Sequence, residues 1–312
     1  MSTTLLILFF LVCLVVLGFA ADHFTDAAES IGHGIGMPQF LVGATIVTLG
    51  TCLPELTSSI IASYRGIPEA VYGNVVGAII ANIVLILGAA AIAANGLKIG
   101  GQAEHIDLPF FLLAIALLVV FGVGGKFTLM EAIAALAVFI IYIIYIIATG
   151  EQRSKHLSPL GMARKINIKS VLILLISAVV VFFSAKYAID FLIDIVKQTS
   201  IGSEVIAVSI VALGTSLPEL TVGIIAARKG QNEIVVGSVL GACVFNALVT
   251  TSIPALMGDL TVTSKILYVA LPVMVFVALL YLFIVRDGKI SRREGVMLLG
   301  LYAAFFVLMY SV

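Results

Sequence analysis

Apolar stretches of about 20 residues alternate with short polar segments along the whole chain. This length matches the roughly 20 apolar residues that a helix needs to cross a membrane. The pattern therefore predicts ten membrane-spanning helices. They cover approximately residues 2–21, 39–63, 69–94, 106–124, 128–149, 168–189, 203–227, 233–257, 263–285 and 293–311. The first stretch lacks the basic leader and the short apolar core of a secretory signal, so we interpret it as a membrane helix.

The composition excludes the soluble classes of protein. Hydrophobic residues make up 62% of the chain and charged residues only 11%, with a mean hydropathy of +1.23, far outside the range of soluble domains. The net charge is zero, so no basic surface for nucleic acid is indicated. The three cysteines all lie in apolar segments, which suggests neither a disulfide framework nor a cysteine-rich metal site. We expect an all-α integral membrane protein in contact with the lipid bilayer, with no protein partner implied.

The chain contains an internal duplication. A shift of 164 residues aligns the segment from Ile46 to Asn82 with the segment from Ile210 to Asn246 without a gap, and about 21 of the 37 aligned positions are identical. Five spans in each half is an odd number, so the second copy must cross the membrane in the opposite direction. The sequence thus predicts two inverted five-helix halves, 1–150 and 168–312, joined by a polar linker at 151–167.

Each copy places one glutamate deep in an apolar span. The stretches LGTCLPEL, residues 49–56, and LGTSLPEL, residues 213–220, carry Glu55 and Glu219 at equivalent positions. The other acidic residues lie in predicted loops or near span ends. An ionised carboxylate at the bilayer centre costs at least about 2.5 to 3.5 kcal/mol, so it normally faces a partner or a wet cavity. Equivalent residues of inverted repeats meet near the bilayer midplane, and we expect the two glutamates to share one site.

Glycine and proline beside these glutamates predict helices that break at the midplane. Pro54 has no backbone N–H and disfavours helical geometry at Leu53, and Gly50 loosens the preceding turn. Such breaks would free carbonyl groups around residues 48–51 and 212–215. Carbonyl oxygens, hydroxyls and two carboxylates form a ligand set that suits Ca²⁺ better than Mg²⁺ or Zn²⁺.

Other interpretations of these residues are weaker. In a purely structural one, Ser216 and Glu219 form a capping box where the second broken helix restarts. A cation channel would more naturally use rings of charge from several subunits around an open pore. An intramembrane hydrolase would need a catalytic motif, which the sequence lacks, so we expect no enzyme and no cofactor.

The doubled GTxLPE motif, followed by GNxxGxxxxN from Gly73 to Asn82, resembles the α-repeats of the sodium/calcium exchanger family, within the cation/calcium antiporter superfamily. The resemblance covers essentially the whole chain. It implies a secondary active antiporter that exchanges Ca²⁺ for Na⁺ by alternating access. It further implies that Ca²⁺ is held by Glu55, Glu219 and the main-chain carbonyls of Thr51 and Thr215.

The Na⁺ positions of the family are kept less well. Ala78 and Ala242 stand where members with well-formed Na⁺ sites carry serine. The coupling ion is therefore open between Na⁺, which the resemblance favours, and H⁺. The remaining candidate ligands are pairs of equivalent positions: Thr48 and Ala212, Cys52 and Ser216, and Asn82 and Asn246.

Lysine and arginine positions predict the orientation in the cell membrane. If the 151–167 loop is cytoplasmic, about twelve basic residues lie in segments on that side and about five on the other. Cytoplasmic loops carry the excess of positive charge. We therefore expect a multi-pass protein with both termini extracellular and the 151–167 loop in the cytoplasm.

Overall fold

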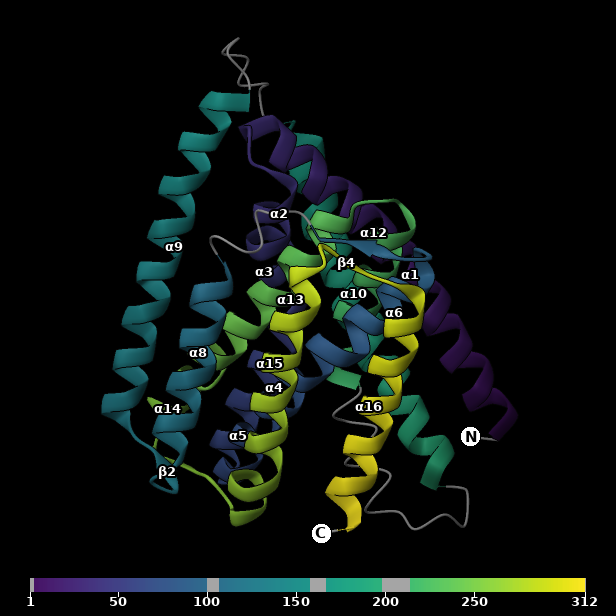
Figure 1. Cartoon of the computed structure of the whole chain (residues 1–312). Coiled ribbons are helices and arrows are strands. Elements are labelled where there is room, and N and C mark those ends of the chain that lie inside the picture. Colours follow the sequence, from purple (N-terminus) through teal and green to yellow (C-terminus); the bar gives the residue numbers. More distant parts are fainter. Residues whose placement is uncertain (1–2, 100–106, 158–166, 198–213, 312) are drawn as a thin grey trace.

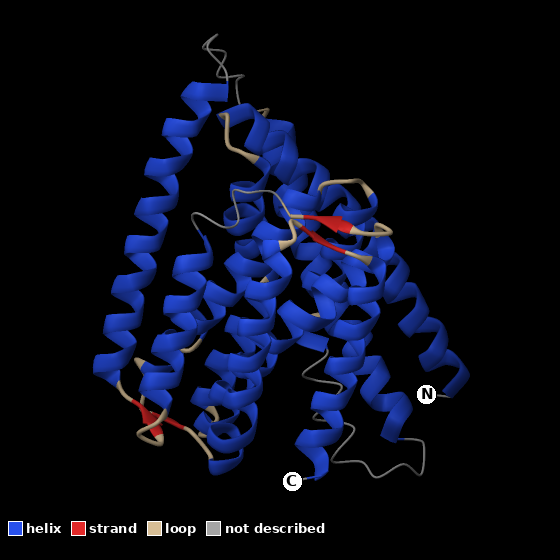
Figure 2. Ribbon diagram, in the orientation of Figure 1, coloured by secondary structure: helices blue, strands red, loops and turns tan. Residues whose placement is uncertain are grey.

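The chain forms a bundle of helices with two very short β-ribbons (Figures 1 and 2). The structure, a computed structural model, describes residues 3–99, 107–157, 167–197 and 214–311. The first half contains α1 (Thr3–Ile35), α2 (Gln39–Val42), η1 (Gly43–Val47), α3 (Thr48–Thr51), α4 (Leu53–Tyr64), α5 (Pro68–Ile80), η2 (Ala81–Ile86), α6 (Leu87–Ala93), α8 (Asp107–Gly122) and α9 (Leu129–Leu157). The second contains α10 (Ile168–Lys197), α12 (Leu217–Arg228), α13 (Asn232–Phe245), η3 (Asn246–Thr250), α14 (Ser252–Ala255), η4 (Ile266–Ala270), α15 (Leu271–Arg286) and α16 (Arg292–Ser311). The η segments are π-helical turns within longer helices.

The helical content confirms a multi-pass, all-helical membrane protein. Six helices in the described residues are long and apolar enough to cross a membrane, or seven if the bent pair formed by 39–51 and 53–64 counts as one span. α8 is apolar but shorter, and the predicted span at 203–227 lies partly outside the described residues. α9 continues to Leu157, so the first residues of the predicted linker are helical.

The predicted break near the first glutamate is present. The helix axis turns by 42° between Thr51 and Leu53, and Cys52 at the turn has φ −80° and ψ 0°. α4 then starts with Pro54 in its first turn, where a missing N–H costs no helical hydrogen bond. α12 starts in the same way after Ser216, with Pro218 in its first turn.

α1 and α10 pack against each other on the outside of the bundle. Phe9 stacks on Phe191, with ring centroids 5.4 Å apart, while the hydroxyls of Ser30 and Ser170 lie 3.0 Å apart. Since an early residue of α1 meets a late one of α10, the two helices run antiparallel. α1 also extends beyond its predicted span, so Asp22, Asp26 and Glu29 lie on a helix rather than in a loop.

α13 forms the buried centre of the bundle together with the α5–η2–α6 helix. The bent pair formed by 39–51 and 53–64 is called the first broken helix below. Close backbone contact is possible because α13 presents glycines to this first broken helix. A Cβ added at Gly241 would lie 2.5 Å from the Ala44 carbonyl oxygen, and one at Gly237 would meet the Phe40 carbonyl. The GxxxG spacing thus serves close helix packing in the second repeat. At Gly73 an added Cβ would meet only the side chain of Ile266.

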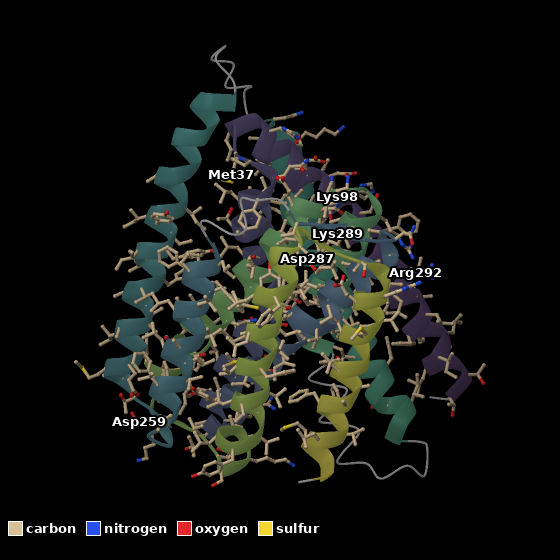
Figure 3. All side chains as sticks on the ribbon, in the orientation of Figure 1. Met37, Lys98, Asp259, Asp287, Lys289 and Arg292 are labelled. Atoms are coloured by element: carbon tan, nitrogen blue, oxygen red, sulfur yellow. The ribbon has the colours of Figure 1, made fainter. Side chains whose placement is uncertain are left out.

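The two ribbons lie at opposite ends of the bundle (Figure 2). β1 (Leu97–Lys98) pairs antiparallel with β4 (Lys289–Ile290), and β2 (Lys126–Phe127) pairs antiparallel with β3 (Leu260–Thr261). Charged side chains accompany both ends (Figure 3): Lys98 and Lys289 lie at the β1·β4 end, and Asp259 lies at the other. Each ribbon therefore ties a loop of the first half to a loop of the second.

Candidate ion-binding site

The helix break leaves main-chain carbonyl groups without helical partners. The Cys52 N–H donates to the Thr48 carbonyl at 2.9 Å, and the Leu56 N–H donates to the Cys52 carbonyl at 3.1 Å. In the described residues, no backbone N–H donates across the break to the carbonyls of Gly50 or Thr51. The predicted release of carbonyls therefore applies to these two residues, whereas the prediction was wrong for the Thr48 carbonyl.

The two motif glutamates meet in the interior of the bundle. Glu55 is 1% exposed and Glu219 is 7% exposed, and their carboxyl groups lie close enough to interact with each other. One carboxyl oxygen of Glu55, Oε2, and both carboxyl oxygens of Glu219 have no hydrogen-bond partner. Buried polar atoms are normally paired, so these oxygens are available as ligands for a cation.

A narrow pocket opens beside the Glu219 carboxyl group. Its polar lining comes from Thr51, Asn82, Glu219 and Ser238, and its apolar lining comes from Val47, Ile86, Val222 and Val239. The Oδ1 atom of Asn82 is also buried without a hydrogen-bond partner. Four elements, α3, η2, α12 and α13, thus bring oxygen-bearing side chains to one place.

Glu219 does not act as a helix cap. Ser216 precedes α12 at the N-cap position, but its side chain makes no capping hydrogen bond. The Ser216 hydroxyl oxygen and both Glu219 carboxyl oxygens have no partner, whereas a capping box requires both side chains to bond to backbone N–H groups. The structural alternative for this motif is therefore wrong in this conformation.

Thr48 has a packing role at the edge of the site. Its hydroxyl lies 3.0 Å from the Gly43 carbonyl oxygen and 3.2 Å from the Ser238 carbonyl oxygen, and it donates to these groups. It thereby connects the first broken helix to α13. Ala212, its equivalent, lies outside the described residues. Thr215, the other motif threonine, is buried beside the second break.

The two candidate asparagines both lie at the start of π-helical turns. Asn82 is the second residue of η2, and Asn246 is the first of η3. Short π-helical turns inside α-helices are frequent at functional sites. The Asn246 side-chain oxygen accepts a hydrogen bond from the Thr250 hydroxyl at 3.0 Å, so unlike Asn82 it is held by a neighbour on its own helix.

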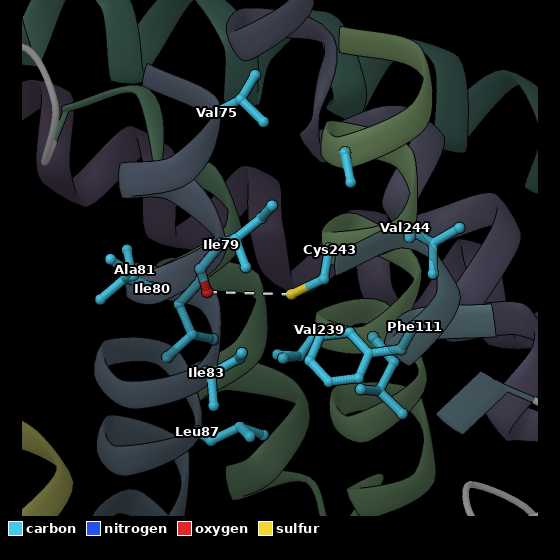
Figure 4. Packing of buried hydrophobic residues seen from close by; sticks show 14 of the residues in the cluster. Val75, Ile79, Ile80, Ala81, Ile83, Leu87, Phe111, Val239, Cys243 and Val244 are labelled. Carbon is cyan, nitrogen blue, oxygen red and sulfur yellow. Dashed lines mark hydrogen bonds between the residues drawn. The ribbon is translucent and has the colours of Figure 1, made fainter. Parts of the chain in front are cut away.

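α5 and α13 approach each other near their C-terminal ends, at Ile79 and Cys243 (Figure 4). The Cys243 thiol points at the main-chain oxygen of Ile79, with an S···O distance of 4.0 Å. Ile79 and Cys243 are equivalent positions in the two copies, as their numbers differ by 164. This contact lies within the main hydrophobic core.

Ser238 is a pocket residue that the sequence analysis did not single out. Its signal was nevertheless present, because Ser238 is the second-copy equivalent of Asn74 in the GNxxG motif. Asn74 lies within 3.5 Å of the Ser59 hydroxyl, one helical turn beyond Glu55. Both motif positions therefore carry polar side chains near a glutamate-bearing helix.

Comparison with known proteins agrees with this geometry. A family model described as sodium/calcium exchanger protein matches residues 5–148 and 169–311. The sodium/calcium exchanger MaX1 of Methanosarcina acetivorans is 31% identical, and the match covers 98% of each chain. The inner membrane protein YrbG of Escherichia coli is 26% identical, with 99% of this chain and 97% of that protein covered.

The fold also matches solved structures along the whole chain. The sodium-calcium exchanger NCX_Mj soaked with 2.5 mM Na⁺ and 10 mM Sr²⁺ superimposes with a TM-score of 0.84 at 28% identity, covering 99% of both chains. The same protein soaked with 2.5 mM Na⁺ and 0.1 mM Ca²⁺ gives a TM-score of 0.83, with 98% of both chains covered. With two matched halves, full-length relatives and a shared fold, the chain belongs to the sodium/calcium exchanger family.

Proposed function

We propose that this protein is a secondary active antiporter that exchanges Ca²⁺ for Na⁺ across a membrane by alternating access. The observation that carries the proposal is the meeting of Glu55 and Glu219 in the bundle interior, with three of their four carboxyl oxygens unpaired. Two carboxylates balance the charge of one divalent ion, and Ca²⁺ takes six to eight oxygen ligands in irregular geometry. NCX_Mj, which has the same fold, was studied with Na⁺, Ca²⁺ and Sr²⁺.

The remaining oxygen ligands come from the breaks and the pocket. The main-chain carbonyl of Thr51 has no backbone donor across the break, and Thr215 occupies the equivalent position in the second copy. Asn82 and Ser238 line the pocket beside Glu219. Ca²⁺ bound between the glutamates would draw on these groups, and Ser216 and Asn246, both buried, remain further candidates by their positions in the second copy.

Exchange follows from the cost of moving an empty site. Two carboxylates that face each other out of water repel, and carrying them uncompensated through an occluded state is unfavourable. One Ca²⁺, several Na⁺ ions or protons on both glutamates would each remove that cost. Only loaded forms then cross readily, so the flux of one ion is coupled to the other.

The proposed architecture is ten spans in two inverted five-helix halves, 1–150 and 168–312, joined by 151–167. Three features support it. The equivalent helices α1 and α10 pack antiparallel. Equivalent residues touch at the centre, where Cys243 meets Ile79 and Glu219 meets Glu55.

The third feature is the way the four short strands pair, because each strand of the first half pairs with a strand of the second half that is not its equivalent. A shift of 164 residues brings β1 close to β3 and β2 close to β4, yet β1 pairs with β4 and β2 with β3, at opposite ends of the bundle. A two-fold axis across the bundle, as in an inverted repeat, produces this arrangement. We further propose that the β1·β4 end is cytoplasmic and that both termini are extracellular, because most loop lysines and arginines belong to that end.

Proton coupling is the alternative to Na⁺ coupling on the same site. Ala78 and Ala242 offer no hydroxyl oxygen at positions where the family resemblance implies serine in members with well-formed Na⁺ sites, and the Asn246 side chain is already bonded to Thr250. With fewer hard donors for Na⁺, protons on the two glutamates could take its place. The family resemblance favours Na⁺.

Uptake of ⁴⁵Ca²⁺ into proteoliposomes that contain the purified protein tests the proposal. The vesicles carry an outward Na⁺ gradient or a pH gradient in separate experiments. Glu219→Gln should abolish uptake, while Glu69→Gln, an exposed glutamate in the first turn of α5, should leave it unchanged. Uptake driven by Na⁺ supports the main proposal, uptake driven only by the pH gradient supports the alternative, and undiminished uptake by Glu219→Gln contradicts both.

A further inference from the structure

α1 covers the first broken helix from the outside of the bundle. The ring of Phe24 packs so closely on Gly50, beside the helix break, that an added Cβ at Gly50 would overlap the ring. Further along α1, an added Cβ at Gly32 would overlap the side chain of Val42. Phe24, Ala28 and Gly32 are spaced four residues apart and lie along one face of the helix. This face of α1 therefore meets the segment that leads into the break.

A cluster of ion pairs fixes the C-terminal half of α1 to the turn between α12 and α13. Lys229, in that turn, places its Nζ atom 2.8 Å from Oδ1 of Asp22 and 2.6 Å from Oδ1 of Asp26. The same Nζ atom donates to the main-chain carbonyl of Asp22 at 3.2 Å. The three side chains are partly exposed, so each ion pair contributes only modestly.

A more buried contact follows two turns further along α1. Each oxygen of the Glu29 carboxylate accepts a hydrogen bond, Oε1 from Gln39 Nε2 at 2.5 Å and Oε2 from Gln231 Nε2. Gln231 is 7% exposed, and a charged acceptor makes such bonds stronger than neutral ones. We use the term polar latch for Asp22, Asp26 and Glu29 of α1 together with Gln39, Lys229 and Gln231.

The polar latch lies toward the β1·β4 end of the bundle. The helix from Asn232 to Ala255 is one span, and the chain continues from it into β3. The turn before Asn232 is therefore at the end opposite to the β2·β3 ribbon (Figure 2). The latch holds α1 in place on the side of the ion site that we propose to be cytoplasmic.

The second copy lacks the residues for an equivalent latch at the other end. A shift of 164 residues gives Lys186 for Asp22, Asp190 for Asp26, Ile193 for Glu29, Arg65 for Lys229 and Ile67 for Gln231. Lys186 beside Arg65 would place two like charges together, and a pair of isoleucines cannot replace the hydrogen bond between Glu29 and Gln231. The polar contacts are thus a feature of one end only.

We propose that the polar latch is a one-sided conformational device that keeps α1 over the first helix break and must open when the ion site faces the β1·β4 end. The inference rests on the proposed alternating access. Inverted repeats give a transporter two closed arrangements that are related by a pseudo-two-fold axis. Contacts that exist in only one arrangement shift the population toward it, so the latch disfavours opening at the β1·β4 end.

Labelling of a buried reporter, Ala28→Cys, measures how often this end opens. Ala28 is 0% exposed on the face of α1 that meets the first broken helix. The purified full chain is treated with a water-soluble maleimide in the absence of Na⁺ and Ca²⁺, and mass spectrometry quantifies each modified cysteine. Lys229→Met and Glu29→Gln should each raise the labelling rate of the reporter roughly fivefold. His23→Gln, at an exposed position on the same helix, is the matched control and should leave the rate unchanged.

The native Cys243 separates opening of this end from general loosening of the fold. It is 0% exposed and lies in the main hydrophobic core, so its labelling should stay at the level of the parent protein. Equal reporter labelling in the parent, Lys229→Met and Glu29→Gln would overturn the inference. A parallel rise at Cys243 would overturn it too, because the latch would then only stabilise the fold.

Crosslinking tests whether the latch has to open during transport. Glu29→Cys and Gln231→Cys are combined in one chain, and a short reducible bifunctional thiol reagent joins them in detergent before reconstitution. The crosslink should stop ⁴⁵Ca²⁺ uptake, and reduction should restore it. Uptake that persists after complete crosslinking would overturn the inference and leave the antiport proposal standing. Absence of uptake in the parent protein under either gradient would instead refute exchange, while the labelling rates still decide whether the latch holds this end closed.

Discussion

Gly241→Ala tests the close packing of α13 against the segment that contains Ala44 and Thr48. A Cβ at this position would lie 2.5 Å from the Ala44 carbonyl oxygen, 2.6 Å from the Thr48 hydroxyl and 2.7 Å from the Ala44 Cα. Ordinary van der Waals contact begins at 3.4 Å, so α13 and the first broken helix would have to separate by nearly 1 Å. Two of the three atoms belong to backbone and cannot turn away.

The expected cost exceeds the intrinsic gain from alanine. Alanine in a helix is more favourable than glycine by about 1 kcal/mol, while overpacking a core costs typically about 1 to 3 kcal/mol and occasionally more. With contacts this short we expect a net destabilisation of about 1 to 2 kcal/mol. In a chain of a few hundred residues each kcal/mol lowers the melting temperature by about 2 to 4 °C. Separation would also loosen the Thr48 contact with Ser238, and under the proposed function this should reduce Ca²⁺ affinity.

Thermal unfolding of the detergent-purified protein measures the first effect, and ⁴⁵Ca²⁺ uptake measures the second. The chain has no tryptophan, so loss of helical circular dichroism is the suitable signal. Gly300→Ala is the matched control, because Gly300 is an exposed residue of α16 and an added Cβ there meets nothing within 4 Å. If Gly241→Ala melts and transports like Gly300→Ala, the close contact between α13 and the first broken helix does not exist in the protein.

Two other contacts between distant segments give predictions of smaller size. Lys229, in the turn after α12, places its Nζ atom 2.8 Å from Oδ1 of Asp22 and 2.6 Å from Oδ1 of Asp26, both on α1. Partly exposed ion pairs contribute about 0 to 1 kcal/mol to stability. Lys229→Met should therefore lower the melting temperature by no more than a few degrees. Burial alone would lower the Lys229 pKa, but hydrogen bonds to the two aspartates outweigh it and raise the pKa. The contribution is therefore fully present below the ordinary lysine pKa of about 10.4 and lost only as pH rises through the higher folded-state value, so melting curves at pH 6 and pH 8 should show the same loss from Lys229→Met. A loss confined to pH 6 would contradict this assignment. The buried Tyr72 hydroxyl donates to the Leu118 carbonyl, and Tyr72→Phe should cost about 1 kcal/mol; an unchanged melting temperature would show that this bond contributes nothing.

The sequence by itself was enough to identify a membrane protein, to reveal the internal duplication and to single out Glu55 and Glu219 as acidic residues within apolar spans. Apolar runs of spanning length report helices because each span must satisfy its own backbone in lipid. The break was readable because proline removes a backbone donor wherever it stands, and the 42° turn beside Pro54 agrees. The approach of Glu55 to Glu219 was also expected from the repeat, because equivalent residues of inverted repeats meet near the bilayer midplane.

Only the tertiary structure decided how individual groups are used. Thr48 and Thr51 look alike in sequence, yet the Thr48 hydroxyl faces the Gly43 and Ser238 carbonyls while Thr51 lines the pocket. Gly241 and Gly73 belong to the same repeated GxxxG spacing, but of the two only Gly241 would bring an added Cβ against another backbone. Hydrogen bonds and packing between segments some 190 residues apart depend on which faces meet across the bundle. Local periodicity carries no information about those faces, so the partners of each polar atom appear only once the helices are packed.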